Sequence, residues 1–297
     1  MKITNKHGLP DAILKAVQND SYRKGDSDYS ISELIKPPRK LQLTKKHWDE
    51  IEEDVSDLIW SLFGQAVHHI AERANVSGIV ERRLFYEVHG KKISGQMDYY
   101  DPSTGILTDY KTATVSKFSF NDFKEWEQQQ NCYAQLLRWN GDKVTKLQIL
   151  GLVRDHRPKE AETAKSFNKP YPGKAEMITL PLWDDKTAVD FIALRVRIHE
   201  AAKLALPECT PEERWARPNS YAIKKKNQKN AVAGHSNYVN LETAEDMVDV
   251  LGRTLHYVEH RPGKNIRCSG YCSAAPFCDQ FKELSRPPNV ILGNPST

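Results

Sequence analysis

The sequence predicts an α/β protein with a mixed central sheet, because the spacing of apolar residues changes several times along the first half of the chain. Two segments repeat apolar residues every three or four positions, as on a buried helix face. Short runs of strand character lie between and after them, separated by turn-type sequences. The order helix, three strands, helix, strand is typical of a sheet covered by helices, and we expect the first three strands to form an antiparallel meander. The helices are predicted at 48–73 and 121–139, and the strands at 78–88, 91–101, 105–112 and 143–153.

The rest of the chain is more polar and is punctuated by prolines. A short helix is expected at 11–17, and a second at 30–35 that Pro37-Pro38 ends. After a polar loop to about residue 174, the pattern predicts a strand at 176–180, a helix at 184–204 and, further on, a helix at 241–259. These features predict three parts: an N-terminal lead-in (1–47), a core (48–205) and a cysteine-containing C-terminal extension (206–297).

The composition is that of a soluble globular protein, since 39% of the 297 residues are apolar and 28% are charged. No apolar run is long enough to span a bilayer and the N-terminus lacks a signal-peptide pattern, so we expect a cytoplasmic protein without a membrane partner. The net charge of +4 permits a nucleic-acid partner without requiring one. Three basic runs are candidate phosphate contacts, although each can equally be a solvated loop: 36–40, 45–46, and Lys224, Lys225 and Lys226.

Two acidic residues and a lysine on neighbouring predicted strands carry the strongest chemical signal. Asp98 lies near the end of one strand and Asp109 lies on the next, so their carboxylates can converge on one Mg²⁺ ion. Lys111 follows Asp109 by two residues and therefore projects from the same face of the strand. An ammonium there can position or help deprotonate an attacking water and can offset charge on a phosphate. The backbone carbonyl of Tyr110 is a further candidate ligand.

The predicted helix before these strands adds to the signal. Gly64, His68 and Glu72 are spaced by four and therefore share one helix face. A glycine inside a helix costs stability unless something approaches the backbone there. Alternating charges on a surface strand are the ordinary alternative, but the strand around Asp109 is mostly apolar, and charge in a buried strand is costly unless it has a use.

Taken in order, these motifs and one on the following helix resemble the PD-(D/E)xK nuclease superfamily. The resemblance is to its RecB-like branch, which includes AddAB nuclease domains, CRISPR adaptation exonucleases and many phage exonucleases. It covers roughly residues 60–155 and implies a restriction-endonuclease-like core, a mixed β-sheet flanked by helices. The matching positions are Gly64, His68 and Glu72, then Gly95 and Asp98, then Asp109 and Lys111, then Gln129 and Tyr133.

The resemblance implies a role for each matching residue. Asp98 and Asp109 would be the two acidic ligands of Mg²⁺ or Mn²⁺, and His68 an additional ligand. Lys111 would be the catalytic lysine. The helix residues that would support the site and contact DNA are Gln129 and Tyr133.

Two positions depart from the pattern of the superfamily. Met97 stands where its name has proline, and Asp109 stands where other members have glutamate. Neither departure removes the ligand chemistry. Glu81, at the start of the first predicted strand, matches an acidic position of the family only loosely.

Four cysteines point to a second metal site. Cys268, Cys272 and Cys278 fall within eleven residues, and Cys209 is a more distant fourth. Four thiolates suit Zn²⁺ or a 4Fe-4S cluster, and spacing alone does not separate these two, although either is favoured over free thiols. Several RecB-like nucleases hold a 4Fe-4S cluster with one cysteine before the core and three after it, which favours iron–sulfur here. The upstream cysteine of that pattern is missing, since none precedes Cys132, itself expected to be a core residue.

The sequence therefore predicts a metal-dependent DNA nuclease, with an exonuclease favoured, that acts in phage or bacterial DNA recombination, repair or processing. The alternative is a metal- or cluster-stabilised DNA-binding subunit of a recombination or packaging complex that does not cut DNA itself. The chain has no Gly-x-x-x-x-Gly-Lys-Ser/Thr motif, so any helicase would be a separate partner. Exonuclease and endonuclease use the same residues, and the sequence does not distinguish them.

Overall fold

The chain folds into two compact units. The computed structural model describes residues 1–19, 25–74 and 77–286. The first unit is Met1–Pro207 and the second is Glu208–Thr297. Within the described ranges, none of the helices combines the length and apolar character that crossing a bilayer requires.

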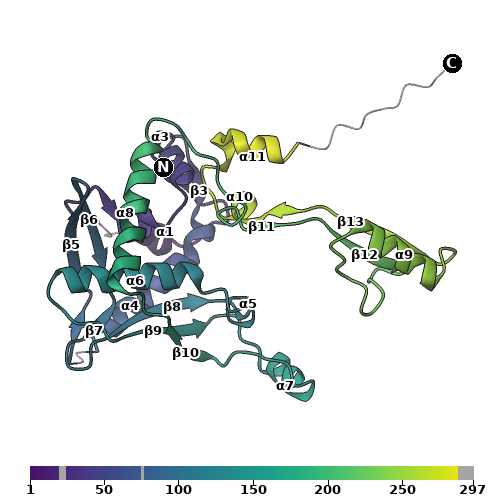
Figure 1. Ribbon diagram of the computed structural model, residues 1–297, viewed down its shortest axis with the longest axis horizontal. Helices are drawn as coiled ribbons and strands as arrows, with labels where there is room; N and C mark the ends of the chain where they lie inside the picture. Colours follow the sequence, from purple (N-terminus) through teal and green to yellow (C-terminus); the bar gives the residue numbers. More distant parts are fainter. Residues whose placement is uncertain (20–24, 75–76, 287–297) are drawn as a thin grey trace. The chain divides into compact units, whose positions relative to one another are not determined.

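A five-stranded mixed sheet lies at the centre of the first unit (Figure 1). Its two longest strands, β8 and β9, pair in parallel, and the other neighbours pair antiparallel. The predicted mixed α/β fold is therefore confirmed. In order across the sheet the strands are β10 (Ala175–Leu180), β9 (Lys146–Val153), β8 (Ile106–Ala113), β7 (Tyr99–Asp101) and β4 (Ile79–Val80).

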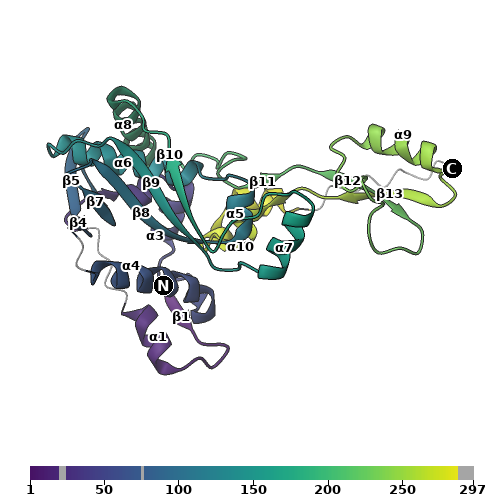
Figure 2. The ribbon, with the colours of Figure 1, turned by 90° about the horizontal axis from the view of Figure 1, so that it is seen from below.

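Helices cover both faces of this sheet (Figure 2). Helix α6 (Lys124–Trp139) connects the parallel strands β8 and β9, and its residues 130–137 are all buried. It ends, as predicted, at Asn140-Gly141, where Gly141 adopts a φ of +91°. Helix α8 (Asp185–Ala201) packs against α6, and α4 (Ile59–Glu72) lies on the opposite face of the sheet.

The predicted meander is present, but its first two strands are bent. Residues 78–88 divide into β4 and β5 (Arg83–Val88), and residues 91–101 divide into β6 (Lys91–Gln96) and β7. The halves beyond the bend form a second sheet in the order β2-β6-β5, where β2 is Tyr29–Ser30. The backbone ladder nevertheless continues, because Glu81 N donates to Asp98 O at 3.0 Å and Met97 N donates to Arg82 O at 3.2 Å. The prediction was right in strand pairing and wrong in expecting unbroken strands.

The N-terminal segment contains the two predicted helices and one that was missed. Helices α1 (Asp11–Gln18) and α2 (Ile31–Leu34) agree with the prediction, and Ser30 and Glu33 form a capping box on α2. The prolines do more than end α2, since Pro38 is the first residue of α3 (Pro38–Lys46). Proline suits that position because its missing N–H has no helical partner there. Side chains from this segment join the main core: Tyr29, Ile31, Leu34 and Leu41.

The predicted helix at 48–73 starts later in the structure. Glu52–Asp54 instead forms β3, which pairs in parallel with β1 (Lys2–Thr4), and a 3-10 turn (Val55–Leu58) precedes α4. The Asp54 carboxylate accepts hydrogen bonds from Lys6 N at 2.7 Å and Thr4 Oγ1 at 2.9 Å. This pairing with a distant segment outweighs the local helical pattern. Two further helices of the first unit were not predicted: α5 (Val115–Ser119), and α7 (Pro158–Ser166), which lies in the predicted polar loop.

Up to residue 286, where the described part ends, the second unit contains two small antiparallel sheets and short helices. The predicted helix at 241–259 is too long, because α9 (Leu241–Leu251) stops at Gly252, whose φ is +94°. Residues 256–259 belong instead to strand β13 (His256–Arg261), which pairs with β12 (Ser220–Lys225) and packs against α9. The remaining elements are β11 (Ala216–Arg217), β14 (Lys264–Asn265), α10 (Ile266–Gly270), a 3-10 turn (Ala275–Phe277) and α11 (Asp279–Leu284).

Candidate metal centre

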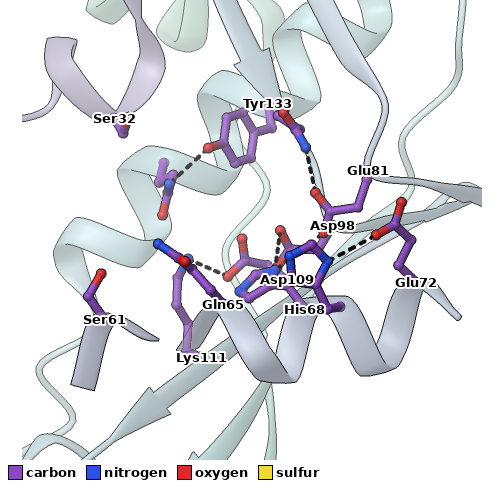
Figure 3. A pocket seen from close by; sticks show the side chains of 13 residues that line it. Ser32, Ser61, Gln65, His68, Glu72, Glu81, Asp98, Asp109, Lys111 and Tyr133 are labelled. Carbon is purple, nitrogen blue, oxygen red and sulfur yellow. Dashed lines mark hydrogen bonds and ion pairs between the residues drawn. The ribbon is translucent and has the colours of Figure 1, made fainter. Parts of the chain in front are cut away.

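A pocket of about 640 Å³ opens in the first unit, lined by side chains of α4, the bent hairpin, β8 and α6. Figure 3 shows these side chains pointing toward one another from separate elements. The six side chains predicted as site residues in this part of the chain are among the lining residues. The full lining is Ser32, Ser61, Gln65, His68, His69, Glu72, Glu81, Gln96, Asp98, Asp109, Lys111, Gln129 and Tyr133.

One histidine and two carboxylates meet at the bend of the hairpin. His68 Nδ1 on α4 lies 3.3 Å from Asp98 Oδ1 and 3.4 Å from Glu81 Oε1. Ligand atoms of the three residues all lie within 4.8 Å of one another, and they are the one such group of three in the part of the chain that the structure describes. Hydrogen bonds to Asp98 and then to Glu81 raise the pKa of His68 to about 10. The carboxylates thus hold a positive charge at this point.

Asp109 and Lys111 form the buried side of the pocket. The Asp109 side chain is 2% exposed, and its Oδ2 lies 2.6 Å from Lys111 Nζ. Burial and then the nearby Asp98 carboxylate raise the pKa of Asp109 to about 7. Burial alone would lower the pKa of Lys111, but the charges of Asp109 and Asp98 outweigh it, and the pKa is raised. The raised pKa favours the ammonium form of Lys111, which can orient a water or offset charge.

Asp98 connects the two halves of the site. Its Oδ1 faces His68, while its Oδ2 accepts a hydrogen bond of 2.7 Å from Tyr110 N. Strand β8 thus fixes the Asp98 carboxylate through its backbone. The Tyr110 ring also packs edge-on against the His68 ring, with 6.2 Å between centroids. Tyr110 lies where its carbonyl was expected as a ligand, and that role stays a prediction.

The residues on α6 form one wall of the pocket. Gln129 Nε2 donates a hydrogen bond of 2.9 Å to the Tyr133 hydroxyl. The helix can approach β6 closely only because residue 95 has no side chain, since a Cβ there would lie 2.7 Å from Leu136 and 2.8 Å from the Tyr133 ring. This contact gives a physical reason for the glycine in the Gly95-x-x-Asp98 motif.

The two motif glycines should therefore differ sharply on substitution. Gly95→Ala is expected to push α6 from β6 and destabilise the protein by about 1–3 kcal/mol, as overpacking does. Gly64→Ala is the matched control, because a Cβ there meets only Thr112 Oγ1 at 3.9 Å. It should stabilise α4 by up to about 1 kcal/mol through helix propensity. Urea unfolding of both variants measures the difference, and equal stabilities would contradict the proposed steric role of Gly95.

The structure adds side chains that the sequence pattern did not single out. Glu81, only a loose match to the family motif, stands beside Asp98 and His68. Gln96 lines the pocket and hydrogen-bonds to Glu81. Glu72 lines the pocket too, but its carboxylate pairs with His69 at 3.4 Å rather than with His68. The signal that could have singled out Glu81 is its register opposite Asp98 on the neighbouring strand, rather than spacing along one strand.

The predicted cysteine ligands all lie in the second unit, while Cys132 is a core residue, as predicted. Burial raises the pKa of the Cys132 thiol to about 12, and that of Cys268 is raised by burial and by its neighbours Cys272 and Cys278. Gln280 holds the backbone of Cys209, since Gln280 Oε1 accepts from Cys209 N and Gln280 Nε2 donates to Cys209 O, each at 2.9 Å. In the described residues no three sulfurs come within the 4.8 Å seen for His68, Glu81 and Asp98.

Of the three basic runs predicted as phosphate contacts, 36–40 and 45–46 lie in or just before α3, and 224–226 lies on and just after β12. Lys224 is paired with Glu259, with 2.6 Å between Nζ and Oε1, and its side chain is 16% exposed. Lys225 and Lys226 are exposed. The three lysines therefore differ in solvent exposure, and of the three only Lys225 and Lys226 have exposed side chains.

Comparisons with known proteins give a weak likeness in fold. No protein-family model matches the chain, and no curated protein matches it. Among solved structures, a protein designated SSO0001 is similar over 69% of this chain and 89% of its own, at 17% identity and a TM-score of 0.45. A phage-related exonuclease from Haemophilus somnus covers 64% of this chain and 78% of its own, at 13% identity and a TM-score of 0.29.

A third similar structure is a protein of Eubacterium rectale, provisionally named an exonuclease. It covers 48% of this chain and 54% of its own, at 18% identity and a TM-score of 0.31. All three likenesses are too remote to assign an activity. The case for a function therefore rests on the pocket.

Proposed function

We propose that the protein is a metal-dependent DNA nuclease of the RecB-like branch of the PD-(D/E)xK superfamily, acting as an exonuclease in phage or bacterial DNA processing. The observation that carries the proposal is the convergence of His68, Glu81 and Asp98 within 4.8 Å, in a pocket that also contains the buried pair Asp109–Lys111. Carboxylates and an imidazole around one point suit Mg²⁺ or Mn²⁺. Burying so many charged groups is costly unless a cation joins them.

Asp98, Asp109 and His68 would hold the ion, with the Tyr110 carbonyl as a further ligand. The chemistry of the donor set fits, since His68 and Asp98 lie 3.3 Å apart and the buried Asp109, paired with Lys111, lines the same pocket. A bound Mg²⁺ would polarise the scissile phosphate and activate a water. Lys111, an ammonium ion beside Asp109, would orient the attacking water and offset the charge that develops on the phosphate.

Other residues would bind and position the DNA. Gln129 and Tyr133, joined by their hydrogen bond, line the pocket where a substrate would enter. Lys225 and Lys226 are proposed phosphate contacts, since both are exposed. Lys224 would have to break its pair with Glu259 to join them. We also propose a helicase or recombination partner that would open the duplex.

Digestion of end-labelled linear DNA and closed circular DNA, with Mg²⁺ or Mn²⁺, tests the proposal. We expect release of nucleotides from the linear substrate only, and none when EDTA is added. Cutting of the circle would make the protein an endonuclease. If the purified protein binds DNA but cleaves neither substrate with either ion, the competing function, a non-cleaving DNA-binding subunit, would replace the nuclease.

We further propose that Cys209, Cys268, Cys272 and Cys278 bind a 4Fe-4S cluster, with Zn²⁺ as the alternative. The donor chemistry fits, because all four cysteines lie in the second unit and thiolates are the ligands that both groups prefer. Cys209 is tied by two backbone hydrogen bonds to Gln280, two residues after Cys278. These contacts support Cys209 as the fourth ligand.

Anaerobically purified protein should therefore absorb in the blue part of the visible spectrum, and Cys268→Ser should lose that band. Cys132→Ala is the matched control, since Cys132 is a buried core residue of the first unit and should leave the band unchanged. Visible spectroscopy combined with metal analysis measures both. A colourless protein with one bound zinc would replace the iron–sulfur assignment.

A further inference from the structure

The backbone of Glu81 adopts a strained conformation, which costs free energy. Its φ is +50°, in the left-handed region that side chains other than glycine and asparagine rarely adopt. Such conformations cost about 1–3 kcal/mol and persist where the surrounding structure imposes them, often at functional sites. Here the bend places Glu81 directly across the hairpin from Asp98, with the backbone ladder intact on both sides.

A chain of hydrogen bonds fixes the Glu81 carboxylate. Its Oε2 accepts from Gln96 Nε2 at 2.6 Å, and Gln96 Oε1 accepts from Arg83 at 2.5 Å. Arg83 also donates to the Ser94 hydroxyl at 3.3 Å, and Ser94 is fully buried. Because a guanidinium can only donate, it forces the amide oxygen of Gln96 toward itself. The amide N–H₂ of Gln96 must then point at Glu81.

This arrangement holds one oxygen of the Glu81 carboxylate with an uncharged donor. Gln96 donates a hydrogen bond to Oε2 but carries no charge. A lysine or arginine in its place would neutralise the carboxylate. Oε1 is left facing His68 at 3.4 Å, on the side of Asp98. An amide that holds one oxygen of a carboxylate while the other faces a cation is a common outer shell of a metal ligand.

We propose that Glu81 is an additional ligand of the metal ion, and that Gln96, itself oriented by Arg83, is the positioning residue that holds it. The inference rests on the metal centre proposed above and adds to it a ligand that the sequence motif matches only loosely. A different role for Glu81, as a counter-ion of protonated His68 alone, would need neither Gln96 nor the strained backbone.

Direct titration with Mn²⁺, in the absence of DNA, tests the inference. Glu81→Gln and Gln96→Leu should each raise the dissociation constant for Mn²⁺ by about 10–100-fold, as loss of a ligand or of its outer-shell partner does. Arg83→Met should also raise the dissociation constant for Mn²⁺, but by a smaller factor. Arg82→Met is the matched control, because the neighbouring Arg82 pairs with Asp142 outside the pocket and should bind Mn²⁺ as wild type does.

A positioning role also predicts a particular kinetic result. In Gln96→Leu the Mn²⁺ concentration for half-maximal cleavage should rise, while kcat at saturating Mn²⁺ should approach that of wild type. Melting curves without metal check that each variant folds. Wild-type Mn²⁺ affinity in both Glu81→Gln and Gln96→Leu would overturn the inference, and so would a wild-type protein that binds no Mn²⁺.

The binding measurement also separates this inference from the proposed activity. If the wild-type protein binds Mn²⁺ and Gln96→Leu weakens that binding, Glu81 is a ligand whether or not DNA is cut. If DNA is cut and Asp98→Asn abolishes Mn²⁺ binding while Glu81→Gln leaves it unchanged, the nuclease assignment stands and the role of Glu81 fails.

Discussion

Replacing Lys111 by alanine is expected to lower the rate of metal-dependent DNA cleavage by at least about 10²–10³-fold, the usual effect of losing a group that stabilises developing charge. Among the described residues that line the pocket, Lys111 is the one with a permanent positive charge. Its ammonium lies 2.6 Å from Asp109, one of the proposed metal ligands. Initial rates on end-labelled linear DNA at saturating Mg²⁺ measure the loss.

The variant should still fold, although it breaks a buried ion pair. Removing one partner of such a pair generally costs about 3–5 kcal/mol, because a charge remains buried. Asp109 can avoid much of this cost, since its pKa is already raised to about 7 and it can take up a proton near neutral pH. Circular dichroism should show a native spectrum.

Lys117→Ala is a matched control for this experiment. Its side chain has the same 22% exposure as that of Lys111, but it pairs with Asp122 outside the pocket. Lys117→Ala should cleave DNA at the wild-type rate. Undiminished cleavage by Lys111→Ala would remove the basis for the nuclease mechanism given above.

Asp98→Asn is expected to abolish both cleavage and stabilisation by metal. An amide oxygen at this position can still accept the hydrogen bond from Tyr110 N, so the fold should be kept. Wild-type protein with Mn²⁺ at about one hundred times its dissociation constant should gain about 2.7 kcal/mol. For a domain of this size each kcal/mol raises Tm by about 2–4 °C, so this gain should be measurable as a rise in Tm. The Asp98→Asn variant should show no shift.

Asp101→Asn serves as the control for Asp98→Asn. It lies three residues further on, at the end of β7, where its carboxylate accepts hydrogen bonds from Ser103 and Thr104. It does not line the pocket. Thermal melting with Mn²⁺ and with EDTA compares the two variants. A full Mn²⁺-dependent shift in Asp98→Asn would show that the ion binds elsewhere.

Local patterns in the sequence predicted the central elements well. Apolar periodicity located α6, β8 and β9, and the Asn140-Gly141 pair located the end of α6, because each depends on neighbouring residues. The pocket also brings together seven side chains that the motifs had singled out one element at a time. The two-residue spacing of Asp109 and Lys111 was enough to place both on one face of a strand.

Features that depend on residues far apart in the sequence could not be predicted from local patterns. The helical pattern at 48–73 gave no sign that Glu52–Asp54 pairs with Lys2–Thr4. The apolar runs at 78–88 and 91–101 concealed a bend, because a positive φ at Glu81 leaves no mark in a pattern of apolar and polar residues. The same bend hid Glu81 and Gln96, whose partners lie on the opposite strand.

The bent hairpin makes the length of this part of the chain more important than its composition. Between Arg82 and Met97 the two strands keep one register, and that register alone decides which residue faces Asp98. Substitutions at the outward positions of β5 and β6 leave it unchanged. Inserting or deleting a single residue within either strand would turn every following side chain to the other face and carry Gln96 or Asp98 away from the metal. Variation in this segment should therefore take the form of exchanged residues, while changes in length should be confined to the turn at 89–90.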